Sequence, residues 1–121
     1  MRPGRFALAL LALAAASAAA AARKLPPYPQ VIRCAALTET WAMQVELMSQ
    51  EGSRRSDKAL YWGLMSVEAA RRRALPPVRY ARDQKKALET ARAQLAANDP
   101  AAAAELDKCV AAVPPRKPPR D

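Results

Sequence analysis

Two stretches, VIRCAALTETWAMQVELM (residues 31–48) and AELDKCVAAV (residues 104–113), carry the only two cysteines of this 121-residue chain. Cys34 and Cys109 lie near opposite ends of the helix-forming part, and two cysteines allow only one intramolecular pairing. In the chain-entropy model, closing a loop of about 75 residues destabilises the unfolded chain by roughly 4–5 kcal/mol. Redox-active cysteines are the alternative, but these usually stand close together, as in C-x-x-C. The sequence therefore predicts a small domain closed by one structural disulfide.

The first 22 residues have the pattern of a secretory signal peptide. Arg2 and Arg5 form a basic start, an apolar run follows from Phe6 to Ala22, and small residues precede Arg23. The alternative is an uncleaved membrane anchor, although the run is short for a span and rich in alanine. Cleavage predicts a periplasmic or secreted protein, in a compartment where disulfides form and persist.

Proline divides the rest of the chain into three parts. Residues 23–30 (RKLPPYPQ) predict an extended, proline-rich arm, and residues 114–121 (PPRKPPRD) predict a disordered, basic, proline-rich tail. Residues 31–113 between them are the predicted folded domain. Glycine is scarce there, and no segment alternates polar and apolar residues in the manner of a strand.

Four segments of this domain have helical periodicity. The first runs from about Val31 to Gln50, with one apolar face, and Gly52–Ser53 is expected to end it. The second begins near Ser56 as an N-cap and ends in three arginines. The apolar faces predicted for these two helices comprise Cys34, Leu37, Trp41, Val45 and Met48, and then Leu60, Leu64 and Val67.

The third and fourth helices have clearer boundaries. Pro76–Pro77 is expected to open the third, which buries Tyr80, Leu88, Ala91 and Leu95. Asp99 is expected to cap the fourth, with Pro100 at its first position. The fourth buries Leu106, Cys109, Val110 and Val113. An all-α, four-helix up-down bundle follows, in which antiparallel first and last helices bring the two cysteines together.

No pattern of residues predicts catalysis. The chain contains no histidine, which removes the commonest general base and metal ligand. It has no nucleophile elbow, zinc-protease motif, phosphate-binding glycine loop or calcium-binding loop. Glu39 and Glu46 are spaced for one helix face, but such pairs are usually solvated charges. We therefore predict a protein that is not an enzyme and has no cofactor and no metal site.

The chain is strongly basic, with a formal net charge of +9. Six cations between residues 71 and 86 form a candidate anion-binding set: Arg71, Arg72, Arg73, Arg79, Arg82 and Lys86. Arg79, Arg82 and Lys86 are spaced to lie along one helix face. This face is either a binding surface for phosphate groups or acidic polymers, or an ordinary helix surface whose charges only interact with solvent. Few aromatic residues accompany them, so nucleic acid is not the expected partner.

Three apolar side chains are left over from the predicted core: Met43, Leu47 and Trp62. They either pack against a second neighbour within the bundle or form an apolar contact patch for a second copy or a client protein. The layout resembles that of small helical periplasmic chaperones of acid stress, which also carry one disulfide, although no motif is shared.

The favoured function is a non-catalytic interaction protein of the cell envelope that binds an anionic envelope component through its basic surface. The alternative is a chaperone-like or inhibitor module that binds a protein client through the apolar patch. No transmembrane segment is expected after cleavage of the signal peptide. The sequence identifies neither the ligand nor the oligomeric state.

Overall fold

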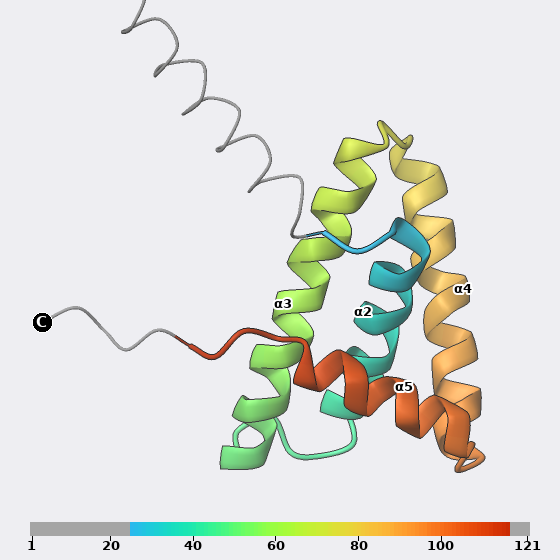
Figure 1. The fold of residues 1–121 in the computed structure, drawn as a ribbon. Coiled ribbons are helices and arrows are strands. Elements are labelled where there is room, and N and C mark those ends of the chain that lie inside the picture. The colour runs from blue at the N-terminus through green and yellow to red at the C-terminus, as the bar shows by residue number, and fades with distance from the viewer. Residues whose placement is uncertain (1–24, 117–121) are drawn as a thin grey trace, which may run out of the picture.

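The computed structural model describes residues 25–116, which form four α-helices and no strand (Figure 1). The helices are α2 (Tyr28–Ala42), α3 (Gln50–Arg72), α4 (Pro77–Ala96) and α5 (Pro100–Ala111). The all-α prediction is confirmed for this part of the chain. The predicted signal peptide, residues 1–22, lies outside the described residues, as do residues 117–121 of the predicted tail.

The helices begin where the local chemistry favours a first turn. Proline stands in the first turn of α2, α4 and α5, where its missing N–H costs no helical hydrogen bond. The Asp99 carboxylate accepts hydrogen bonds from the N–H groups of Ala101 and Ala102, as predicted for the start of α5. Because α2 begins at Tyr28, residues 28–30 are helical, and the predicted arm is wrong for these three residues.

Helix α2 is the centre of the fold, because it packs against each of the other three helices. Figure 1 shows α3 and α4 on opposite sides of it. Val31, Leu37 and Thr38 of α2 are fully buried, and the Thr38 hydroxyl donates to the Cys34 carbonyl oxygen over 2.7 Å. That bond satisfies the one polar group of a side chain that would otherwise be costly to bury.

Helix α5 differs from the up-down prediction. Helices α2, α3 and α4 alternate in direction, but α5 crosses α2 instead of running beside it (Figure 1). Cys34 lies in the middle of α2 and Cys109 near the end of α5, and the crossing brings their Cα atoms within 5.5 Å. The predicted disulfide is present, but it joins two crossed helices and not two antiparallel ones.

The boundary between the first two predicted helices was wrong. α2 ends at Ala42, residues 43–49 form a loop, and α3 starts with Ser49 as its N-cap, whose hydroxyl accepts from the Gly52 N–H over 2.9 Å. Gly52 therefore lies inside the first turn of α3. A side chain there would collide with the carbonyl groups of Glu46 and Leu47, so this position needs glycine because the loop passes close to it.

This early end of α2 moves several side chains out of their predicted places. Met48, expected in the core, is 93% exposed in the loop. Glu39 is in α2 and Glu46 is in the loop, so these two carboxylates do not share one helix face.

The buried face of α3 is opposite to the predicted one. Trp62, Ser66, Ala69 and Ala70 are buried, whereas Leu60, Leu64 and Val67 are exposed. Trp62 is 2% exposed, and its indole N–H donates to the Cys109 carbonyl oxygen over 2.9 Å. The small residues on the same face let α3 lie close to α2. None of the helices within residues 25–116 is both long and apolar enough to span a bilayer.

Candidate anion-binding site

A basic groove of about 420 Å³ lies between α2 and α4. Its walls combine the first two turns of α2, one face of α4 and the end of α3. The lining residues are Tyr28, Pro29, Ile32, Arg33, Arg73, Arg79, Asp83, Lys86, Ala87 and Thr90. Four cations therefore surround a hollow that contains one carboxylate.

The spacing of residues along α4 explains one wall of this basic groove. Arg79, Asp83, Lys86 and Thr90 follow one another at intervals of four, three and four residues, which places them on one face of a helix. The opposite wall comes from α2, where Tyr28 and Ile32 are one turn apart. Ile32 and Ala87 add apolar side chains to the lining of the groove.

Tyr28 and Asp83 tie the two walls together. The Tyr28 hydroxyl donates to Asp83 Oδ2 over 2.8 Å, and the Arg73 guanidinium lies 5.2 Å from the centre of the Tyr28 ring. Burial and this hydrogen bond raise the pKa of Tyr28 to about 12, so the phenol is neutral at ordinary pH. The single carboxylate of the groove is therefore already engaged as an acceptor.

The cations of the groove differ in how they are paired. Arg33 forms a bidentate ion pair with Glu105 of α5, with nitrogen–oxygen distances of 3.0 and 3.2 Å. Among residues 25–116, Arg73, Arg79 and Lys86 have no carboxylate within ion-pair distance. These three cations are held near one another in a concave site, where like charges repel.

Half of the predicted anion-binding set lines the groove. Arg73, Arg79 and Lys86 do so. Arg71 and Arg72 instead bind Glu68 at 2.6 and 3.0 Å, and their hydrogen bonds lower the pKa of Glu68 to about 2. Arg82 is exposed and lies outside the groove.

Arg33 was not predicted as a site residue. It is the only charged residue between Leu25 and Thr38, within a segment that is otherwise apolar or uncharged. A lone cation in the central helix was the one signal in the sequence that could have identified it.

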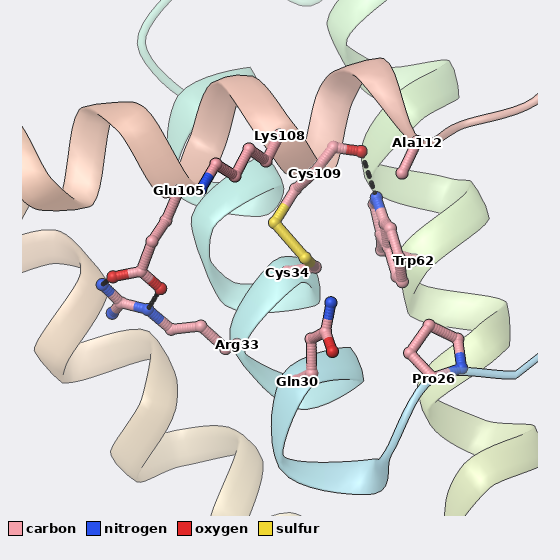
Figure 2. Close-up of a pocket in the computed structure, with 9 residues that line it drawn as sticks. All are labelled: Pro26, Gln30, Arg33, Cys34, Trp62, Glu105, Lys108, Cys109 and Ala112. Atoms are coloured by element: carbon pink, nitrogen blue, oxygen red, sulfur yellow. Dashed lines mark hydrogen bonds and ion pairs between the residues drawn. A yellow bond between two sulfur atoms is a disulfide. The ribbon is translucent and has the colours of Figure 1, made fainter.

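A second hollow, of about 270 Å³, lies over the disulfide. Figure 2 shows Arg33 and Glu105 on one side of the Cys34–Cys109 bond, and Trp62 and Pro26 on the other. Arg33 lines both this cleft and the basic groove. Cys34 and Cys109 are both buried, which favours a structural bond over one that exchanges with external thiols.

The three residues of the predicted apolar patch do not form one surface. Met43 and Leu47 are 65% and 69% exposed in the loop before α3, and both line a shallow hollow of about 410 Å³. Trp62 is buried between α3 and α5, so it contributes to the core and not to a contact surface.

Within residues 25–116, no three histidine, cysteine, aspartate or glutamate side chains come together as a possible metal site. Comparison of the chain with protein families, curated proteins and solved structures finds no match. The arrangement of side chains in the basic groove is therefore the basis for a functional proposal.

Proposed function

We propose that this protein is a non-catalytic binding protein of the cell envelope that holds an anionic group in the basic groove between α2 and α4. The observation that carries the proposal is the convergence of Arg73, Arg79 and Lys86, none of which has an ion-pair partner among the described residues. Bringing these cations together costs electrostatic free energy, which a bound anion recovers.

The chemistry of the groove favours oxygen anions such as phosphate or carboxylate groups. Arg73 and Arg79 offer planar guanidinium groups that bind such anions through paired hydrogen bonds, and Lys86 adds a compact charge. Pro29 and Ala87 add apolar surface beside these cations, which suits an anionic group attached to a less polar body. Lipid headgroups and acidic envelope glycans both carry groups of this kind.

The proposed envelope location is supported by the disulfide and by the predicted signal peptide. The disulfide is a bond that persists in oxidising compartments. The predicted signal peptide would deliver the chain to such a compartment, either the periplasm or the extracellular space.

A paired set of variants tests the groove. We expect the purified protein to bind inorganic pyrophosphate and vesicles containing an anionic phospholipid, with an affinity that falls as salt is raised. Arg79→Gln with Lys86→Gln is expected to weaken binding at least tenfold, because each lost charge-assisted hydrogen bond contributes about 1.5–3 kcal/mol. Calorimetry and vesicle co-sedimentation measure the two ligands separately.

The matched control is Arg82→Gln with Lys85→Gln, which removes the same charge from exposed positions of α4 outside the groove. This control is expected to retain most of the affinity. If both double variants lose the same affinity, binding depends on net charge alone and the groove is not the site. Absence of binding to both ligands at low salt would also contradict the proposal.

The alternative function is a chaperone-like or inhibitor module that binds a client protein through exposed apolar side chains. Met43 and Leu47, at 65% and 69% exposed, support it. Suppression of the aggregation of an unfolded test protein, lost in Met43→Ser with Leu47→Ser, would favour this alternative over the groove.

A further inference from the structure

The connection between α3 and α4 carries exposed apolar residues that the anion-binding proposal does not use. Pro76 and Pro77 are exposed, and Val78 in the first turn of α4 is 71% exposed. Leu75 beside them packs instead against the core. We refer to Pro76, Pro77 and Val78 as the apolar tip, and Figure 1 shows this connection at the end of the bundle away from α5.

Backbone hydrogen bonds hold the apolar tip in place. The Leu75 N–H donates to the Ala70 carbonyl oxygen and the Tyr80 N–H to the Pro76 carbonyl oxygen, each over 3.1 Å. The hydroxyl groups of Ser66 and Tyr80 lie 2.6 Å apart and join α3 to α4 below the tip. The exposed apolar side chains are therefore already ordered, and a partner that covers them loses little free energy in ordering them.

Positive charge surrounds the apolar tip. Residues 69–80 contain four arginines and no acidic residue. Two of these arginines, Arg71 and Arg72, share the carboxylate of Glu68. The other two, Arg73 and Arg79, have no carboxylate within ion-pair distance among residues 25–116, and both line the basic groove. The tip and the groove therefore adjoin each other and share two cations.

The opposite end of the bundle has a different charge. Because α2, α3 and α4 alternate in direction, the α2–α3 loop and the α4–α5 turn lie at the end away from the apolar tip (Figure 1). Four carboxylates lie at or near that end: Glu39, Glu46, Glu51 and Asp99. Arg54 and Arg55 are paired with Glu51 there. Positive charge is in excess only at the end with the tip, which is the end that an anionic surface attracts.

We propose that the apolar tip and the basic groove dock this protein, end on, to an anionic lipid bilayer. The groove takes the phosphate of a lipid headgroup, and the tip enters the boundary between the headgroups and the acyl chains. This inference rests on the proposed anion binding and names the lipid bilayer as the source of the anion. Apolar residues ringed by cations suit a bilayer, because buried apolar area and attraction to anionic headgroups add to each other. A soluble acidic glycan would use the same cations but would leave the tip in water.

Co-sedimentation of the exported form of the protein with vesicles tests the inference. We expect binding to vesicles of phosphatidylcholine and phosphatidylglycerol, and none to vesicles of phosphatidylcholine alone. Val78→Ser is expected to weaken vesicle binding about tenfold, because the valine side chain leaves water on docking. The same variant should bind inorganic pyrophosphate as the wild type does, since that ligand needs only the cations of the groove.

Met48→Ser is the matched control, because Met48 is 93% exposed in the α2–α3 loop at the opposite end. It removes an exposed apolar side chain without touching the apolar tip, and it should bind vesicles as the wild type does. Circular dichroism checks that both variants are folded. Equal effects of Val78→Ser and Met48→Ser on vesicle binding would overturn the docking of the tip.

A fluorescence measurement locates the inserted end directly. Tryptophan in Val78→Trp should be quenched by lipids brominated on their acyl chains, whereas the added tryptophan of Met48→Trp should not be. Equal quenching of the two variants would overturn the end-on orientation. Binding to pyrophosphate or to a soluble acidic polysaccharide, without binding to vesicles, would overturn the membrane inference and leave the anion-binding groove supported. A wild-type protein that binds neither pyrophosphate nor vesicles would contradict the proposed function itself.

Discussion

Replacing both cysteines with alanine is the perturbation with the largest expected effect on this fold. The bond joins residues 75 apart in sequence, and the chain-entropy model gives a stabilisation of about 4.5 kcal/mol for a loop of that length. Both residues are buried, so removing the two sulfur atoms also leaves a small unfilled space that costs about 1 kcal/mol. The free energy of unfolding should fall by about 5.5 kcal/mol.

This loss is comparable with the whole stability of a domain of this size, for which about 5–15 kcal/mol is typical. We therefore expect Cys34→Ala with Cys109→Ala to be partly or wholly unfolded at 37 °C. Urea unfolding followed by tryptophan fluorescence measures the change directly, because Trp62 is buried beside the disulfide. The linear dependence on urea gives the free energy of unfolding for both proteins.

The control is the wild-type protein unfolded in the presence of a reductant, which should match the double variant to within about 1 kcal/mol. A double variant that loses less than about 1 kcal/mol would refute the reasoning. It would mean that the Trp62–Cys109 hydrogen bond and the Arg33–Glu105 ion pair hold α5 in place without the covalent bond.

Three further predictions concern single positions. Gly52→Ala should destabilise the protein by about 1–3 kcal/mol in urea unfolding, because the new methyl group collides with the carbonyl group of Glu46 and also meets the carbonyl oxygen of Leu47 at 2.9 Å; no loss would show that the loop over α3 is free to move away. Ala74→Gly should raise the melting temperature, with a gain of about 0.5–1 kcal/mol, since Ala74 has φ 51° in the left-handed region that glycine adopts without strain; a lower melting temperature would contradict this. The pKa of Tyr28 is raised to about 12, above its ordinary value of 10. The stability that the neutral Tyr28 phenol contributes is therefore complete below pH 10 and is lost as the pH rises through 12. In an ultraviolet titration one of the three tyrosines should therefore ionise late, and Tyr28→Phe should remove that transition; a Tyr28→Phe protein that keeps it would show that another tyrosine is responsible.

The sequence was sufficient to predict the helices whose ends are set by proline and capping residues. Pro77 opens α4 and Asp99 caps α5, because the fixed φ of proline and the short carboxylate of aspartate act locally. The pairing of Cys34 with Cys109 was also predictable, since no other cysteine is present. The crossing of α5 over α2 was not, because it depends on which surfaces pack and not on any local signal.

The reversed face of α3 shows why periodicity alone was insufficient. Leu60, Leu64 and Val67 are the more hydrophobic set, and the hydrophobic effect by itself favours their burial. The opposite face combines one large residue, Trp62, with serine and alanine, and it fits closely against α2. Close packing of small residues, together with the hydrogen bond from Trp62 to α5, therefore outweighs the burial of two leucines and a valine.

The basic groove was predictable only in part, because it is assembled from three separate segments. The sequence placed Arg79 and Lys86 on one face of a helix, and α4 has them there. Nothing local indicated that α2 would supply the opposite wall. Arg71 and Arg72 of the wider set instead pair with Glu68, which precedes them by one turn of α3.

Helix α2 connects the disulfide to the basic groove through two consecutive residues. Cys34 is bonded to Cys109, and its neighbour Arg33 is paired with Glu105, one turn before Cys109 on α5. The covalent bond therefore keeps Glu105 beside Arg33 and neutralises much of the charge that Arg33 would bring to the groove. The disulfide thus holds α5 across α2 and, through the Arg33–Glu105 pair, also affects the net charge of the proposed anion site. The oxidation state of the cysteines and the affinity of the groove for anions should therefore be measured on the same preparations.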